Sequence, residues 1–130
     1  MVKIKKLCST IAAVGVVAVG LGTYAQAATY KGYSTTVPIF NDYESSPLKK
    51  ATTGSAYNDV SRIDNDKLVS WVENSSGSNV TSKVSYTSTG TKIMDYSSAS
   101  TQKGKDLHLN ISTSVGTISS VYTKGEWTPN

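Results

Sequence analysis

The most informative stretch of this chain is DLHLNIST, residues Asp106–Thr113, in which polar and apolar side chains alternate without a break. Leu107, Leu109 and Ile111 occupy every second position of the stretch. Side chains of a β-strand point alternately to its two faces, so a period of two over this length predicts a half-buried strand. No segment after residue 27 repeats apolar residues at helical spacing, which predicts an all-β protein.

Shorter segments of the same kind precede and follow this strand. Residues 68–73 (LVSWVE) carry apolar side chains on both faces, which predicts a central, well-buried strand with Trp71 in the core. Further strands are expected at residues 28–37, 57–63, 80–88, 92–96 and 117–124. Thr89-Gly90 is expected to close a hairpin between two of them, and Gly125-Glu126-Trp127 to end the last.

The intervening segments are polar and are typical of turns and loops. Residues 41–50 are expected to form a loop after a small apolar anchor, Ile39-Phe40, and residues 41–62 as a whole are the least regular part. Short strands joined by such turns predict a small antiparallel β-sandwich, or a partly open barrel, of about six to eight strands. The length of residues 28–130 corresponds to a single domain.

The first 27 residues have the organisation of a secretory signal peptide. Three lysines are followed by an apolar run at residues 11–21, and Ala25 and Ala27 supply the small residues that a signal peptidase recognises. Cleavage before Ala28 predicts a secreted, extracellular domain without a membrane span, since a spanning helix needs about 20 apolar residues. Cys8 precedes the apolar run, whereas a lipoprotein cysteine would follow it.

Removal of this segment changes the charge and the redox chemistry of the protein. The three lysines leave with it, so ten basic side chains remain against nine acidic ones. A nearly neutral domain without a basic cluster gives little electrostatic support to nucleic-acid binding. The only cysteine also leaves, so no disulfide is expected, and one histidine without cysteines excludes a zinc site of the usual kind.

Three short motifs occur together in residues 68–130: a strand bearing Trp71, the connection Tyr96-Ser97-Ser98-Ala99-Ser100, and the ending GEWTPN. Together with the signal peptide they resemble a family of small secreted proteins of Gram-positive bacteria whose function is unknown. The resemblance implies secretion and a β fold, and it brings no defined activity. Some similar proteins are regarded as bacteriocin-like, which implies an effector that acts on the envelope of another cell.

The residues that carry catalysis in other proteins are sparse here. His108 is the only histidine, and its neighbours on the same strand face are Asp106 and Asn110, so a Ser-His-Asp relay would have to use it. The chain has no Gly-x-Ser-x-Gly motif, and an outward histidine on a half-exposed strand is usually a surface residue. We therefore predict no catalytic residues, and a hydrolase ranks third among the functions considered.

Two clusters are candidates for binding. Asp64 and Asp66 are calcium candidates because hard cations take clustered oxygens, but Asp-Asn-Asp is also a common turn, and the choice stays open. No cofactor is expected. The tyrosines, in particular Tyr96 and Tyr122, could form a stacking surface for cell-wall glycans, with packing into the sheet as the alternative.

These observations favour a secreted, non-enzymatic β-domain that acts at a cell envelope through a receptor, as a bacteriocin-like effector would. The alternative is a carbohydrate- or cell-surface-binding module. The sequence leaves the molecular target and the oligomeric state open.

Overall fold

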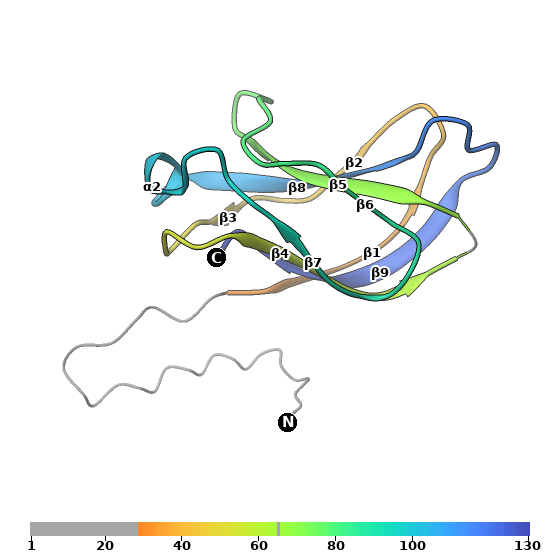
Figure 1. The fold of residues 1–130 in the computed structure, drawn as a ribbon, viewed down its shortest axis with the longest axis horizontal. Coiled ribbons are helices and arrows are strands. Elements are labelled where there is room, and N and C mark those ends of the chain that lie inside the picture. The colour runs from red at the N-terminus through yellow and green to blue at the C-terminus, as the bar shows by residue number, and fades with distance from the viewer. Residues whose placement is uncertain (1–28, 65) are drawn as a thin grey trace.

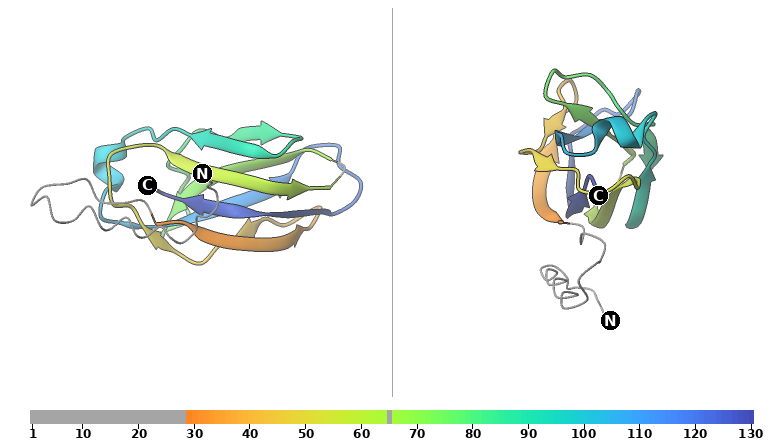
Figure 2. Two further views of the ribbon diagram at one scale, coloured as in Figure 1. Left: turned by 90° about the horizontal axis from the view of Figure 1, so that it is seen from below. Right: turned by 90° about the vertical axis from the view of Figure 1, so that its left-hand side faces the viewer.

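The computed structural model describes residues 29–64 and 66–130, which form two antiparallel β-sheets packed face to face (Figure 1). In chain order the elements are β1 (Lys31–Val37), β2 (Tyr43–Glu44), β3 (Leu48–Lys49), β4 (Ala56–Ile63), β5 (Leu68–Asn74), β6 (Val84–Tyr86), β7 (Gly90–Met94), α2 (Ala99–Gln102), β8 (Asp106–Thr113) and β9 (Val121–Thr128). One sheet has the order β1-β9-β4-β7, and the other has the order β2-β8-β5-β6 with β3 also paired to β8. The predicted β-sandwich is therefore confirmed (Figure 2).

The alternating stretch forms β8 with the bounds that the sequence predicts. Leu107, Leu109 and Ile111 are fully buried in the core between the sheets. β8 pairs from Leu107 to Thr113 with β5 on one side, and with the short strands β2 and β3 on the other. Residues 41–50, predicted to be a loop, therefore contribute two short strands, because β8 offers them an open edge with unpaired backbone groups.

The two tryptophans are both buried but occupy different environments: Trp71 is only 5% exposed, as predicted for this strand, yet it lies outside the cluster of core residues between the two sheets. Leu68, Ser70 and Val72 of β5 face inward and are fully buried, so alternation turns Trp71 to the outer face of the sheet. There its ring is covered by the ammonium of Lys83, 4.2 Å from the ring centroid. The tryptophan in the core is Trp127, which is fully buried on β9.

The last strand lies four residues further along the chain than the sequence predicts. β9 runs through Gly125 and Trp127 instead of ending there. Gly125 faces the core at a point where a Cβ would lie 2.5 Å from the carbonyl oxygen of Asp59 and 2.8 Å from the Tyr33 hydroxyl. The glycine is therefore required by close packing inside a strand, and it does not mark a turn.

The predicted hairpin at Thr89-Gly90 does not form. β6 pairs with β5, whereas β7 pairs with β4 of the opposite sheet, so the connection crosses from one sheet to the other. Gly90 has a φ of 113°, a conformation that side chains other than glycine rarely adopt, and it redirects the chain at this crossing. The segment predicted as a short strand near residues 57–63 is the eight-residue strand β4, which lies between β9 and β7.

A polar network crosses the core and joins the two sheets. The Tyr33 hydroxyl donates to Asn58 Oδ1 at 2.7 Å. Asn58 Nδ2 donates to the Tyr86 hydroxyl at 3.2 Å and to Ser70 Oγ at 3.5 Å. Tyr33 and Asn58 belong to one sheet, and Ser70 and Tyr86 to the other. Buried polar groups of this kind stabilise a fold only when they are paired, so Asn58 is the central residue of the network.

The buried tyrosines predict a loss of stability in alkali. Burial raises the pKa of Tyr86 to about 12 and raises the pKa of Tyr33 and of Tyr96 well above the usual range. An unfolded tyrosine ionises near pH 10. Because the folded pKa values are higher, this contribution to stability is complete below about pH 10 and is lost as the pH rises through the folded values. Denaturant midpoints should therefore fall steeply above about pH 10, and Tyr86→Phe should make the fall less steep.

Candidate docking surface

Three large apolar side chains are almost fully exposed on two loops. Phe40 is 92% exposed in the loop between β1 and β2, and Val115 and Ile118 are 105% and 89% exposed in the loop between β8 and β9. Folded domains expose scattered apolar atoms everywhere, but side chains of this size that lie wholly in water and close together usually mark an interaction site. We call Phe40, Val115 and Ile118 the apolar tips.

The apolar tips lie at one end of the sandwich. Thr113 Oγ1, at the base of one loop, donates to the Ile39 carbonyl of the other at 3.2 Å. The Ser114 amide donates to the Lys67 carbonyl at 3.4 Å, which ties the β4–β5 turn to the same end. Figure 1 shows both loops at the end of the molecule away from the C terminus. The fold thus holds the bases of the loops while their apolar side chains project.

The sequence does not predict this surface. Ile39-Phe40 is expected to be an anchor in the core, yet Phe40 is the more exposed of the two residues. Val115 precedes Gly116, whose φ of 92° belongs to a turn that points Val115 outward. The available signal was that apolar residues stand in otherwise polar loops without an alternating partner.

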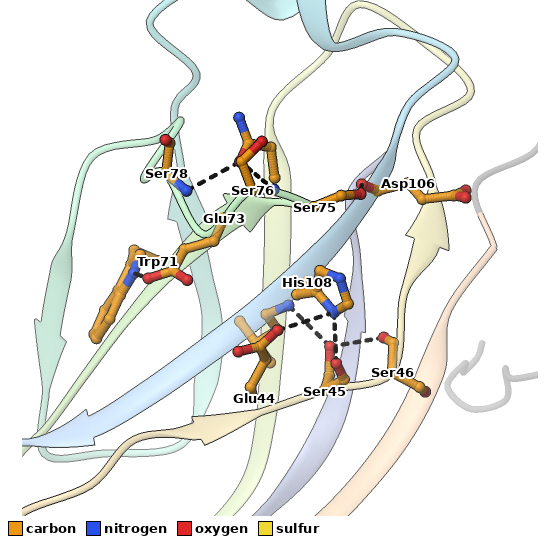
Figure 3. Close-up of polar contacts among 12 residues, drawn as sticks. Glu44, Ser45, Ser46, Trp71, Glu73, Ser75, Ser76, Ser78, Asp106 and His108 are labelled. Atoms are coloured by element: carbon orange, nitrogen blue, oxygen red, sulfur yellow. Dashed lines mark hydrogen bonds and ion pairs between the residues drawn. The ribbon is translucent and has the colours of Figure 1, made fainter.

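His108 is held by backbone and does not face an activated serine (Figure 3). Its Nδ1 lies 2.8 Å from the Ser45 carbonyl oxygen and 3.4 Å from Glu44 Oε2. Ser45 Oγ donates to the Ser46 carbonyl and accepts from the Leu109 amide. The hydroxyl of Ser45 is therefore hydrogen-bonded to backbone groups on both its donor and its acceptor side. The contact of His108 with the Ser45 carbonyl attaches the β2–β3 segment to β8.

The strand neighbours of His108 are also engaged elsewhere. Asp106 forms an exposed ion pair of 3.3 Å with Lys49. Asn110 is buried between Glu44 and Trp71, the residues opposite it on the neighbouring strands. The described residues thus do not arrange Asp106, His108 and Asn110 as a relay.

Tyr96 packs at the C-terminal end of the domain. Its hydroxyl donates to the Pro129 carbonyl at 3.0 Å, and the Lys50 ammonium lies 4.2 Å from its ring centroid. Lys50 is itself fully buried and donates to the carbonyl oxygens of Gly54, Pro129 and Asn130. Both contacts attach the C-terminal residues, so the Tyr96 hydroxyl and the ring face beneath Lys50 are not free to bind a glycan.

Tyr122, like Tyr96, is half-buried. It lies on the outer face of β9, where its hydroxyl is 2.6 Å from Ser34 Oγ and Arg62 packs 4.8 Å from its ring centroid. The two tyrosines lie on different parts of the molecule and do not form one stacking surface, so glycan binding through them stays a prediction that rests on Tyr122 alone.

The calcium candidates are occupied by protein groups. Arg62 donates to both carboxylate oxygens of Asp64, at 2.9 and 3.1 Å. Asp66 Oδ1 accepts from the Lys67 amide at 2.7 Å, as expected for a turn. Within residues 29–64 and 66–130, no group of three or more acidic, histidine or cysteine side chains is placed to hold a metal ion.

The N-terminal predictions concern residues that the structure does not describe. Ala25, Ala27 and Ala28 lie outside residues 29–64 and 66–130, so cleavage at this site stays a prediction. Among the residues that are described, no helix is long and apolar enough to cross a membrane.

Comparison with known proteins leaves the residues themselves as the guide to function. No protein-family model, no curated protein and no solved structure matches this chain. What the domain does is therefore inferred from its exposed side chains.

Proposed function

We propose that this chain is a secreted, non-enzymatic β-sandwich domain that attaches to the lipid surface of a cell envelope through the apolar tips. The observation that carries the proposal is the almost complete exposure of Phe40, Val115 and Ile118 at one end of the fold. Complete burial of a side chain of this kind contributes about 1.5–3 kcal/mol. Three tips together can offset part of the loss of freedom that accompanies attachment.

The shape of this end favours lipid over a protein partner. The apolar tips project from two separate loops whose bases are held by hydrogen bonds from the Thr113 hydroxyl and the Ser114 amide to backbone carbonyls. A protein partner would need matching holes for each of them, whereas the acyl boundary of a bilayer needs no complementary shape. Attachment at the membrane–water interface also agrees with the shallow depth that the apolar tips can reach, because each tip is a single side chain in a loop.

The small net charge has a consequence for the lipids involved. With ten basic and nine acidic side chains after residue 27, the domain gains little from the surface potential of anionic membranes. We therefore expect neutral and anionic vesicles to bind it about equally. Attachment of this kind is compatible with the bacteriocin-like effector role that the resemblance implies, in which the domain meets the envelope of another cell.

The prediction is tested with a protein that begins at Ala28, since every described strand pairs within residues 31–128. Phe40→Ser and Ile118→Ser should each weaken cosedimentation with phosphatidylcholine vesicles by about tenfold or more, because about 1.4 kcal/mol corresponds to tenfold. Ile93→Ser is the matched control, since Ile93 is 53% exposed on β7, away from the apolar tips. Vesicles that contain a dye should bind the parent without releasing the dye.

Three results would contradict the proposal. Equal vesicle binding by the parent and by Phe40→Ser would show that the apolar tips do not contact lipid. A parent that ignores vesicles but sediments with purified cell wall, and loses this on replacement of Tyr122, would instead support the carbohydrate-binding alternative. Dimers that dissociate on Phe40→Ser would assign the tips to contact between copies of this chain.

A further inference from the structure

One edge of the sandwich is built differently from the other three. β1 stands at the end of its sheet and pairs with β9 on one side, and no described strand pairs with its other side (Figure 2). A strand that is paired on one side presents its remaining backbone N–H and C=O groups to solvent, where a further strand can join them. Soluble proteins usually protect such edges, so an edge without protection indicates a place where a strand can be added.

The other three edges are protected. β2 and β3 have two residues each and are separated by a segment that contains Pro47, and β6 has three residues. β7 has five residues, and Lys92 in its middle lies on the same face as the buried Asn58 opposite it. An inward-pointing charge on an edge strand opposes the addition of another strand. β1 has seven residues, no proline, and a single charged residue, Lys31, at its first position.

The register identifies the backbone groups that β1 leaves unpaired. The amide of Asp64, which follows β4, donates to the Tyr122 carbonyl at 3.0 Å, so the backbone groups of Tyr122 point toward β4 and away from β1. These directions alternate along a strand, so the odd-numbered residues of β9 bond to β1, and they lie opposite the odd-numbered residues of β1. The N–H and C=O groups of Gly32, Ser34 and Thr36 therefore point to the open side.

These three residues are complementary to a second copy of the same strand. In an antiparallel pair centred on Ser34, each Ser34 faces its counterpart, and Gly32 faces Thr36 of the other copy. Each of these facing pairs exchanges two backbone hydrogen bonds. The three side chains are small and exposed, so none blocks the approach. Lys31 faces Val37 of the other copy, so the pairing brings no like charges together.

We propose that two copies of this domain pair through β1, antiparallel and centred on Ser34, and so join their four-stranded sheets into one continuous sheet. A second copy fits this edge better than a disordered peptide, because its β1 is already held extended by β9 and loses little freedom on pairing. With ten basic and nine acidic side chains after residue 27, the copies repel each other only weakly. The contact is a single strand edge, so the dimer dissociates on dilution.

The antiparallel pairing places the apolar tips at opposite ends of the dimer. Phe40 lies three residues beyond Val37, the last residue of β1, and the paired β1 of the second copy ends at the other side of the contact. A dimer can therefore attach to two lipid surfaces and hold them together. This consequence rests on the proposed lipid attachment, whereas the pairing of β1 does not.

Ser34 provides the test, because it faces its own counterpart. For the protein that begins at Ala28, sedimentation equilibrium up to about 1 mM should show a dimer fraction that rises with concentration. Ser34→Lys and Ser34→Glu should each be monomeric, because like charges would lie opposite each other, and their equimolar mixture should form dimers again. Thr91→Lys is the matched control: Thr91 is an exposed threonine on β7, the other edge of the same sheet, and this variant should dimerise like the parent.

A proline tests the same contact without a change of charge. Ser34→Pro removes an N–H that points to the open side and makes no bond to β9, and edge strands tolerate proline at such a position. This variant should keep the circular dichroism spectrum of the parent and should be monomeric. It keeps the proposal testable if a charged residue at position 34 disturbs the fold.

The same variants separate dimerisation from lipid attachment. The parent should cluster phosphatidylcholine vesicles, which dynamic light scattering detects as larger particles. Ser34→Lys should bind these vesicles without clustering them, and Phe40→Ser should dimerise without binding them. Dimers that ignore vesicles would count against lipid attachment and leave the pairing of β1 intact.

Three results would overturn the proposal. A parent that is monomeric at every concentration would leave the β1 edge to a strand of another protein. Folded Ser34→Lys and Ser34→Pro variants that dimerise as the parent does would place the contact elsewhere. Dimers that dissociate on Thr91→Lys but not on Ser34→Lys would assign the contact to the β7 edge.

Discussion

Replacing Trp127 with alanine should lower the free energy of unfolding by about 3–5 kcal/mol, the usual cost of removing a large buried aromatic side chain. Trp127 is completely buried in the core, and its strand, β9, pairs with both β1 and β4. Against a total of about 5–15 kcal/mol for a typical domain, this loss would leave a marginal fold. Chemical denaturation followed by circular dichroism measures it.

Trp71→Ala is the natural comparison. Trp71 is also buried, with 5% exposed, but its ring lies on the outer face of its sheet beneath Lys83 and outside the core cluster, so its removal should cost less than that of Trp127. Trp127→Phe should also cost less than Trp127→Ala. Phenylalanine keeps an aromatic ring in the core, and the indole N–H that it removes makes no hydrogen bond with the described residues. A larger loss for Trp71→Ala than for Trp127→Ala would mean that the core is misplaced.

The contrast between the tryptophans shows what local sequence can predict. In β8 only one face is apolar, so alternation alone identifies the buried side chains. In β5 both faces are apolar, and alternation says only that Trp71 lies opposite Leu68 and Val72. Which face meets the other sheet depends on strands distant in sequence, here on Asn58 and Met94, which contact Ser70.

Strand pairing over long separations limited the rest of the fold prediction in the same way. Thr89-Gly90 has the composition of a hairpin turn, but β7 pairs with β4 and forms the edge strand of the other sheet. β2 and β3 are too short to show alternation, and only the open edge of β8 makes them strands. The sequence around Gly125 suggests a turn, because it does not show that the Tyr33 hydroxyl packs against this position in the fold.

The candidate sites were harder to predict than the fold, for a related reason. An apolar residue in a loop is buried or exposed according to the path of the loop, and Phe40 and its neighbour Ile39 differ in this respect although they are adjacent. Asn110 belongs to the polar face of β8, which predicts exposure, yet Glu44 and Trp71 on the flanking strands enclose it. The sequence pattern of one strand does not reveal which side chains of the neighbouring strands cover it.

Replacing Asn58 with alanine should lower the free energy of unfolding by about 3–5 kcal/mol, although Asn58 is polar. Asn58 is fully buried, accepts from the Tyr33 hydroxyl at 2.7 Å and donates to the Tyr86 hydroxyl at 3.2 Å. Alanine would leave these buried hydroxyls short of partners, at about 1–3 kcal/mol each, and would also leave a cavity. Denaturant unfolding of the parent and the variant measures the loss.

A second substitution distinguishes lost hydrogen bonds from lost volume. If orphaned hydroxyls cause the loss, Tyr33→Phe in the Asn58→Ala background should recover about 1 kcal/mol, because it removes a buried group that no longer has its acceptor. In the parent the same Tyr33→Phe change should destabilise, because it breaks a satisfied hydrogen bond. The sign of the Tyr33→Phe effect should therefore reverse between the two backgrounds. Two effects of the same sign would mean that Asn58 stabilises the sandwich by filling space, and that the network between the sheets contributes little.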